Sequence, residues 1–256
     1  MSLTQSKLKN YFNELLEPNL FEDYTPNGLQ IEGASEIKRL AFSVSATQDS
    51  IQKSIFWGAD GLVVHHGVFW KHQGTRPITG AWGQRIKLCV KHDLNLFSYH
   101  LPLDGHQELG NAVALARELG LINILPFAPY KGRPLGCKGE LSTPLSAFDF
   151  KVKLKNLLQH EIILASGDEK KEMKTIGIVT GGANNEWIKA HEDGLDAYLT
   201  GEISEYNWHD SIEAGLHYFA GGHHATERFG IKSLMEKVKK DFPDLEVTFF
   251  DSDNKA

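Results

Sequence analysis

The sequence has little cysteine and no long apolar run. Its 256 residues contain two cysteines, Cys89 and Cys137, which lie far apart and form no CxxC pattern. We therefore expect two small buried thiols in a reducing compartment. No stretch approaches the ~18 consecutive apolar residues of a transmembrane helix, and the N-terminal segment lacks the apolar core of a secretory signal. These absences predict a cytoplasmic protein with no membrane partner.

The chain also lacks a strong net charge. It has 27 basic and 33 acidic residues, which give a formal charge of −6 with histidine neutral. Such a chain is a poor candidate for broad binding to nucleic acid, unless lysine and arginine gather on one surface. The 41% hydrophobic and 23% charged residues are typical of a globular protein with a sizeable core, and they exclude a disordered chain or a coiled coil.

Histidine is the residue type that stands out. Of 12 histidines, six fall between positions 65 and 106 and four between 209 and 224. Histidine is the commonest metal ligand and the usual acid or base near neutral pH. The two groups therefore raise the question of whether they meet at one site.

Short apolar runs alternate with amphipathic stretches of helical length along most of the chain, which predicts an α/β fold with parallel or mixed sheets. Residues 123–145 hold four prolines and three glycines, so we interpret them as the crossing between two lobes, residues 1–125 and 126–256. A last strand at 245–250 then belongs to the second lobe. The segments GADGLVVHHG and GLDAYLTGE share one layout of helix, glycine, strand and polar end, which hints that the lobes are similar.

Polar clusters follow the predicted strands, where ligands gather in open α/β sheets. His65 and His66 follow one strand, Asp104 follows another, and His223 and Glu227 follow a third and open a helix. The spacing of the last pair places an imidazole and a carboxylate one helical turn apart, where they can converge on a metal. Each cluster also has a structural interpretation, namely a surface histidine pair, a turn-forming aspartate and an acidic residue at a helix N-terminus.

Together these donors are three imidazoles and two carboxylates, with no thiolate. Five such donors exceed a four-coordinate structural zinc site and suit two ions that share a carboxylate, for which Glu227 is the natural bridge. Neighbours in a strand point to opposite faces, so His65 and His66 can serve one cluster only if the chain turns there or if each serves a different ion. The donor types suit Fe, Zn, Mn, Ni or Co.

Other polar residues sit near these clusters. His100 lies in the same loop as Asp104 and is suited to orienting a ligand or moving a proton. Glu202 follows a strand and is a candidate acceptor or general base, although a carboxylate at a helix start explains it nearly as well. Gly181 and Gly182 suit either phosphate binding or a tight turn.

Several long motifs in order resemble one known family. They are NGLQIEG, GADGLVVHHGVFW, YHLPLDGHQELGN, DAYLTGEISE and FAGGHHATERFGI, and the likeness runs from about residue 20 to 251. These motifs resemble the NIF-three-like (YbgI-type) dinuclear metal-centre family, whose members are often labelled GTP cyclohydrolase I type 2 homologues. The chain is similar to the short form of that family, which has no extra domain between its halves.

The resemblance implies a ligand for each metal position. By that likeness His66 and Asp104 hold one ion, His65 and His223 hold the other, and Glu227 touches both. It also implies two related α/β lobes with the dinuclear site in the cleft between them, assembled as a ring-shaped homohexamer.

Position relative to those ligands makes His100, Glu202 and His224 the candidates for catalysis or for facing substrate. The resulting hypothesis is a dinuclear metal-dependent hydrolase that acts on a nucleotide-like substrate, in which these three residues move protons. Two alternatives stay open: a metal-dependent phosphoesterase, and a metal-binding hexameric scaffold or interaction protein without turnover.

Overall fold

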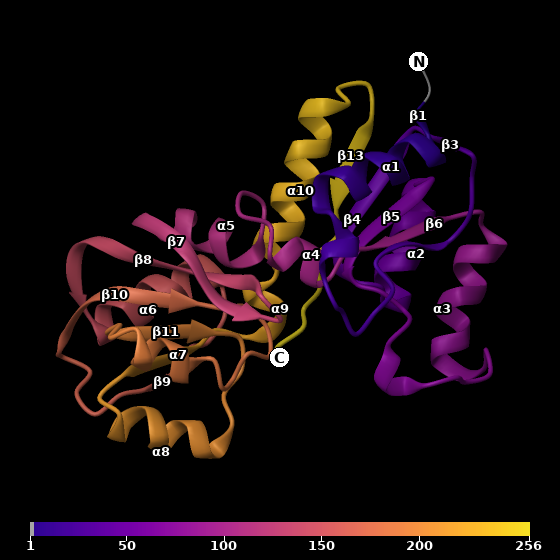
Figure 1. Cartoon of the computed structure of the whole chain (residues 1–256). Helices are drawn as coiled ribbons and strands as arrows, with labels where there is room; N and C mark the ends of the chain where they lie inside the picture. Colours follow the sequence, from indigo (N-terminus) through magenta and orange to yellow (C-terminus); the bar gives the residue numbers. More distant parts are fainter. Residues whose placement is uncertain (1–2) are drawn as a thin grey trace. The chain divides into compact units, whose positions relative to one another are not determined.

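The computed structural model describes residues 3–256, which fold as two compact units, each with its own sheet (Figure 1). The first unit takes the chain up to residue 106 together with residues 231–253, and the second takes residues 107–230 and 254–256. The chain thus passes between the units after residues 106, 230 and 253. The second passage falls inside helix α10 (Arg228–Asp241).

The first unit is built on a five-stranded sheet of order β13-β4-β5-β6-β2. Strands β13, β4, β5 and β6 run parallel, and β2 pairs with β6 in the antiparallel sense. The elements of this unit besides the end of α10 are β1 (Leu3–Thr4), α1 (Gln5–Leu16), η1 (Pro18–Leu20), β2 (Gly28–Ile31), β3 (Glu36–Ile37), β4 (Arg39–Ser45), α2 (Gln48–Trp57), β5 (Gly61–His66), η2 (Lys71–Gln73), α3 (Gly80–Lys91), β6 (Asn95–Ser98), α4 (Leu101–Asp104) and β13 (Glu246–Phe249).

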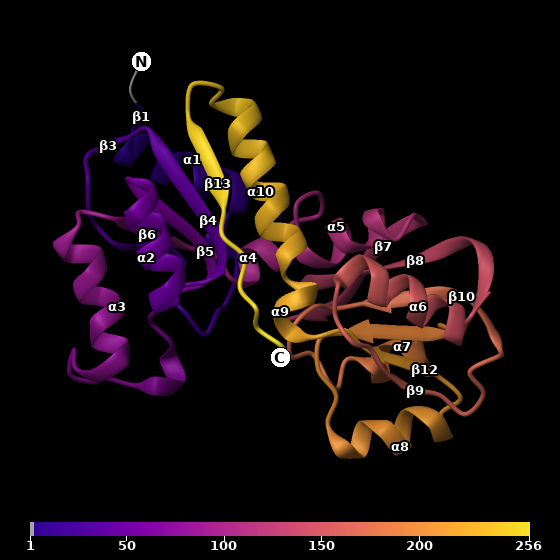
Figure 2. The same cartoon turned by 180° about the vertical axis from the view of Figure 1, so that it is seen from behind.

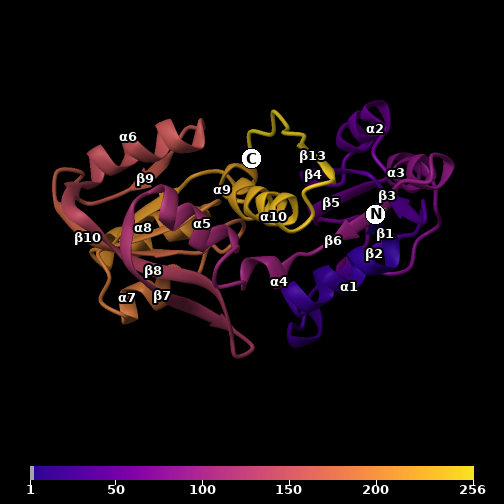
Figure 3. The same ribbon diagram turned by 90° about the horizontal axis from the view of Figure 1, so that it is seen from above.

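Alternation along the strands gives this sheet two buried faces. Leu62 and Val64 of β5 pack with α2 and α3 in one apolar cluster. On the other face Phe12 of α1 contacts the rings of Phe97 and Tyr99, at centroid distances of 5.7 and 5.5 Å. Figure 3 shows α1 and α2 on opposite sides of the strands. The ends of the parallel strands are thereby held in fixed positions, with the histidines of β5 at the carboxyl end.

The second unit is built on a six-stranded sheet of order β7-β8-β10-β11-β12-β9. Its central strands β10, β11 and β12 are parallel, and the outer pairings are antiparallel. Its elements besides the start of α10 are α5 (Asn111–Glu118), β7 (Leu121–Tyr130), β8 (Arg133–Ser146), α6 (Ala147–Leu158), β9 (Ile163–Ala165), β10 (Glu172–Ile178), α7 (Trp187–Glu192), β11 (Ala197–Thr200), α8 (Glu205–Glu213), β12 (His217–Ala220) and α9 (His223–Thr226).

Alternation again separates two faces in this sheet. Ala197 and Leu199 of β11 belong to the cluster that α5 and α6 cover, whereas Tyr198 between them belongs to the cluster that includes α7. Both sheets are mixed with a parallel centre, so the predicted α/β class is confirmed. No helix among residues 3–256 has the length and apolar character that crossing a membrane requires.

The proline- and glycine-rich stretch 123–145 is a β-hairpin in the second unit. Strands β7 and β8 pair in the antiparallel sense, and the two-residue loop between them, Lys131 and Gly132, has φ of 47° and 83°. Positive φ at both positions is the geometry of a tight hairpin turn, which glycine favours. The predicted boundary at residues 125 and 126 therefore falls inside β7, and the units divide elsewhere, after residue 106. Asn123, with φ of 53°, lies where the pairing register shifts.

The predicted last strand is present as β13, in the first unit. It pairs in parallel with β4, with Val247 opposite Leu40 and Phe249 opposite Phe42. Figure 2 shows β13 beside β4. The assignment of residues 231–253 to the first unit thus differs from the prediction, which placed them with residues 126–230. Periodicity along the chain indicates a strand but carries no information about its partner.

Candidate metal centre

Three imidazoles meet in the first unit at the carboxyl end of β5. His65 and His66 are its last two residues, and His100 precedes α4 after β6. The ring centroids of His65 and His66 lie 4.6 Å apart, and His65 lies 5.0 Å from His100. One ring nitrogen from each residue falls within 4.8 Å of the others. The two neighbouring histidines of β5 therefore converge despite the alternation of the strand, and this group could hold a metal ion.

The Nδ1 atom of each of these imidazoles is held by a hydrogen bond. His65 Nδ1 lies 3.1 Å from the Tyr99 carbonyl oxygen, and His66 Nδ1 lies 3.0 Å from Ser45 Oγ. His100 Nδ1 lies 2.8 Å from a carboxylate oxygen of Asp23. Carbonyl and carboxylate oxygens only accept, so Nδ1 of His65 and of His100 carries the proton, and Nε2 of the neutral ring keeps its lone pair. Metal-binding histidines are commonly oriented in this way.

Asp104 adds a carboxylate to the same group. It is the last residue of α4, and its Oδ2 lies 3.5 Å from Nε2 of His65. The His65 side chain is fully buried and that of Asp104 is 11% exposed. The structure thus brings His65, His66 and Asp104 together, with His100 beside them.

Asp23 is a residue at this site that sequence reasoning missed. It is 6% exposed, and its carboxylate accepts hydrogen bonds from the His100 ring, the Asn27 side chain and the Leu101 amide. Burial alone would raise the pKa of Asp23, but these hydrogen bonds, with that from His100 first, outweigh it and hold the pKa below its usual range. The sequence carries only a weak signal for Asp23, which lies four residues before Asn27, the first residue of the NGLQIEG motif.

In the second unit, His223 lies between two carboxylates. Its Nδ1 is 2.5 Å from Oε1 of Glu202, and its Nε2 is 3.2 Å from Oε2 of Glu227. His223 begins α9, and Glu227 follows the last residue of that helix, so the four-residue spacing does place them together as predicted. Glu227 is 3% exposed.

This arrangement has a definite electrostatic consequence. With Nδ1 donating to Glu202, the Nε2 lone pair of neutral His223 faces an oxygen of Glu227. The two acceptors are compatible when a proton or a metal cation lies between them. Burial alone would lower the pKa of His223, but the hydrogen bonds and charges of Glu227 and Glu202 outweigh it and raise the pKa to about 9. The donor set therefore fits a divalent cation.

Glycine allows the backbone to approach these ligands closely. A Cβ added at Gly181, which follows β10 with φ of +69°, would lie 2.2 Å from Oε1 of Glu227. A Cβ at Gly201 would lie 2.6 Å from Cα of His223. Gly181 thus lies directly against a predicted ligand.

The remaining predicted residues have different surroundings. Glu202 has a side chain 48% exposed and orients His223 through Nδ1. His224 is 5% exposed, and its backbone amide donates to the carbonyl oxygen of Ala256.

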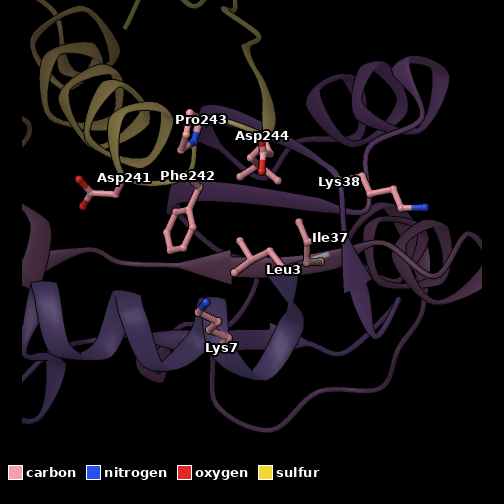
Figure 4. Close-up of a pocket in the computed structure, with 9 residues that line it drawn as sticks. Leu3, Lys7, Ile37, Lys38, Asp241, Phe242, Pro243 and Asp244 are labelled. Carbon is pink, nitrogen blue, oxygen red and sulfur yellow. The ribbon is translucent and has the colours of Figure 1, made fainter. Parts of the chain in front are cut away.

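The first unit has a cavity of about 250 Å³ (Figure 4). None of the histidines and carboxylates described above lines it. No histidine of the described chain lines it, and its carboxylates come from the end of α10 and the turn after it. Its walls are formed by Leu3, Lys7, Ile37, Lys38, Asp241, Phe242, Pro243, Asp244 and Leu245.

Known proteins match this chain over nearly its whole length. The family model Duf34/NIF3 (NGG1p interacting factor 3) matches residues 3–255. The Haemophilus influenzae protein named GTP cyclohydrolase 1 type 2 homolog is 42% identical over 251 residues, which cover 98% of each chain. The solved structure titled protein ybgI, unknown function, is 37% identical with a TM-score of 0.92 and covers 99% of this chain and 100% of that one. A second solved structure, TTHA1606 from Thermus thermophilus, is 28% identical with a TM-score of 0.89, over 99% of this chain and 100% of that one. The resemblance drawn from the motifs is thereby confirmed, and the chain belongs to the Duf34/NIF3 family.

Proposed function

We propose that this chain is a metal-dependent hydrolase that binds two divalent ions and acts on a nucleotide-like substrate. One observation carries the proposal. His65 and His223 each have Nδ1 hydrogen-bonded to an oxygen and Nε2 facing a carboxylate, from Asp104 in the first case and from Glu227 in the second. Repeated imidazole–carboxylate pairs with fixed tautomers are the usual construction of a metal site.

Each ion then takes ligands of both kinds. In this proposal His66 and Asp104 hold one ion, His65 and His223 hold the other, and Glu227 touches both. Nitrogen and oxygen donors without thiolate suit Fe, Zn, Mn, Ni or Co. The proposal requires that the two units present their halves of the site to one another.

A pair of bound divalent ions lowers the pKa of water and makes hydroxide available near neutral pH. The chain's own residues supply the other parts of the chemistry. His100 donates from Nδ1 to Asp23, which leaves Nε2 as its proton acceptor, and its ring lies beside those of His65 and His66. Glu202 orients His223, and His224 is in this proposal a further candidate for proton transfer.

The substrate class comes from the relatives. The name of these relatives, GTP cyclohydrolase 1 type 2 homolog, supports a purine nucleotide such as GTP. In this proposal water attacks the imidazole ring of that nucleotide. A ring-shaped homohexamer is part of the same proposal, carried by the family resemblance. The two free buried cysteines agree with action in a reducing compartment such as the cytoplasm.

The test begins with metal content. Protein purified without added metal, then loaded with Mn²⁺ or Zn²⁺ and desalted, should carry two ions per chain. It should hydrolyse GTP or, if the phosphoesterase alternative holds, bis(4-nitrophenyl) phosphate.

The variant Glu227→Gln should lose metal and turnover, whereas Glu205→Gln, an exposed acid that begins α8, should lose neither. Wild-type protein that retains no metal would refute the proposal. Two bound ions without turnover, together with a hexamer that dissociates in Glu227→Gln, would establish the scaffold alternative instead.

A further inference from the structure

The carboxylate of Asp23 has four hydrogen-bond donors around it. Oδ1 accepts from Nδ1 of His100 at 2.8 Å and from the Tyr24 amide at 2.5 Å. Oδ2 accepts from the Asn27 side chain at 2.8 Å and from the Leu101 amide at 2.9 Å. Both oxygens are thus engaged, so this buried group has a fixed orientation.

His100 is fixed on its other sides as well. Its backbone amide donates to Oδ1 of Asn27 at 2.8 Å. The ring of Trp70 meets the imidazole edge-on, with centroids 5.2 Å apart, and His65 lies 5.0 Å away. Because Nδ1 is engaged by Asp23, Nε2 is the ring nitrogen left for chemistry. One nitrogen of the ring lies within 4.8 Å of a nitrogen of His65 and of His66.

We infer that Asp23 is the positioning residue of His100: it keeps the proton on Nδ1, so that Nε2 acts as the base of the site. The role as base rests on the proposed function. The tautomer itself does not, because it follows from the hydrogen bonds of the chain alone.

The variant Asp23→Asn offers a sharp test, because an amide can accept at only one of the two carboxylate positions. If its NH₂ group takes the Oδ2 position, it opposes both the Leu101 amide and the Asn27 NH₂ group. If it takes the Oδ1 position, it opposes the Tyr24 amide, while the imidazole can switch from donor to acceptor. The two backbone amides cannot accept, and a flipped Asn27 amide would oppose the His100 backbone amide. We therefore expect the His100 proton to move to Nε2.

The control is Asn27→Ala. It removes the acceptor of the His100 backbone amide and the Asn27 donor to Oδ2 of Asp23, but it leaves the contact between Oδ1 of Asp23 and the imidazole in place. Histidine labelled with ¹⁵N in EDTA-treated protein reports the tautomer directly through two-bond ¹H–¹⁵N couplings, with His100→Gln to assign the signal. Spectra at pH about 8.5 favour neutral rings, whose ordinary pKa is about 6.5.

We expect wild-type protein and Asn27→Ala to carry the His100 proton on Nδ1, and Asp23→Asn to carry it on Nε2. In the Zn²⁺-loaded proteins, Asp23→Asn should keep the wild-type metal content and KM for GTP while kcat falls about 10- to 100-fold.

A wild-type proton on Nε2, or an unchanged tautomer in Asp23→Asn, overturns the positioning by Asp23. If Asp23→Asn does not fold, the wild-type spectrum alone decides. A switched tautomer with unchanged kcat overturns the role as base. Wild-type protein without metal or turnover instead refutes the proposed function, and the tautomer measurement distinguishes that failure from the others.

Discussion

The substitution Gly181→Ala should act on the metal centre through one methyl group. The added Cβ would lie 2.2 Å from Oε1 of Glu227 and 3.2 Å from Nε2 of His223, at a backbone φ of +69°. Because Glu227 must retreat by roughly 1 Å to restore ordinary contact, metal affinity should fall about 10- to 100-fold, which is about 1.4 to 2.8 kcal/mol. The left-handed backbone adds a folding cost of about 1 to 2 kcal/mol.

Two other glycines separate these effects. Gly215 has φ of +74° and nothing within 4 Å of an added Cβ, so Gly215→Ala carries the backbone strain alone. Gly182→Ala places a Cβ 3.6 Å from both Glu202 and His223 without a positive φ, which is ordinary contact.

Calorimetric titration with Mn²⁺ measures affinity, and thermal unfolding in EDTA measures the folding cost. We expect Gly215→Ala to lower Tm only, Gly182→Ala to change little, and Gly181→Ala to lose both stability and affinity. Wild-type affinity in Gly181→Ala, or an equal loss in Gly182→Ala, would refute the reasoning.

Three further predictions concern stability and metal removal. Burial raises the pKa of Asp196, but hydrogen bonds from the Thr175 and Lys174 amides outweigh it and hold the pKa below its usual range. This carboxylate therefore stabilises the fold above its unfolded pKa of about 3.9, and the stabilisation is lost as the pH falls through its folded pKa. The variant Asp196→Asn should thus have a lower Tm than wild-type protein at neutral pH, and the difference should vanish at acid pH. Phe12→Ala should cost about 3 to 5 kcal/mol in urea unfolding, because the ring is fully buried against Phe97; a cost under about 1 kcal/mol would contradict that packing. EDTA treatment of loaded wild-type protein should lower its Tm, and added Mn²⁺ should restore it, whereas the Tm of Glu227→Gln should not respond.

Much of the local structure could be predicted from the sequence. Helix α1, which is capped by Thr4 and ends before Pro18, and helix α5 are examples. These elements follow from periodicity, capping side chains and proline, all of which act within a few residues.

Pairing between distant segments could not be predicted in that way. Strand β13 joins β4 across about 200 residues, and nothing in its apolar alternation identifies that partner. The prolines and glycines of residues 123–145 predict a crossing, because proline usually interrupts strands, yet β7 and β8 accommodate them with a tight turn and a shift in register.

The candidate site divides along the same line. His65, His66 and Asp104 could be grouped from the sequence because each follows a predicted strand. Asp23 could not, because its importance comes from four hydrogen-bond donors, two of which lie 77 and 78 residues away along the chain.

The two units differ in when the ribosome has made all the strands of their sheets. Residues 107–230 leave the ribosome as nearly all of the second unit, whereas the first unit still lacks its edge strand until residues 246–249 are made. During that interval the backbone of β4 exposes an unpaired edge, the kind of surface on which nascent chains associate with one another. The sheet whose first strands are made first is thus the sheet that is completed last.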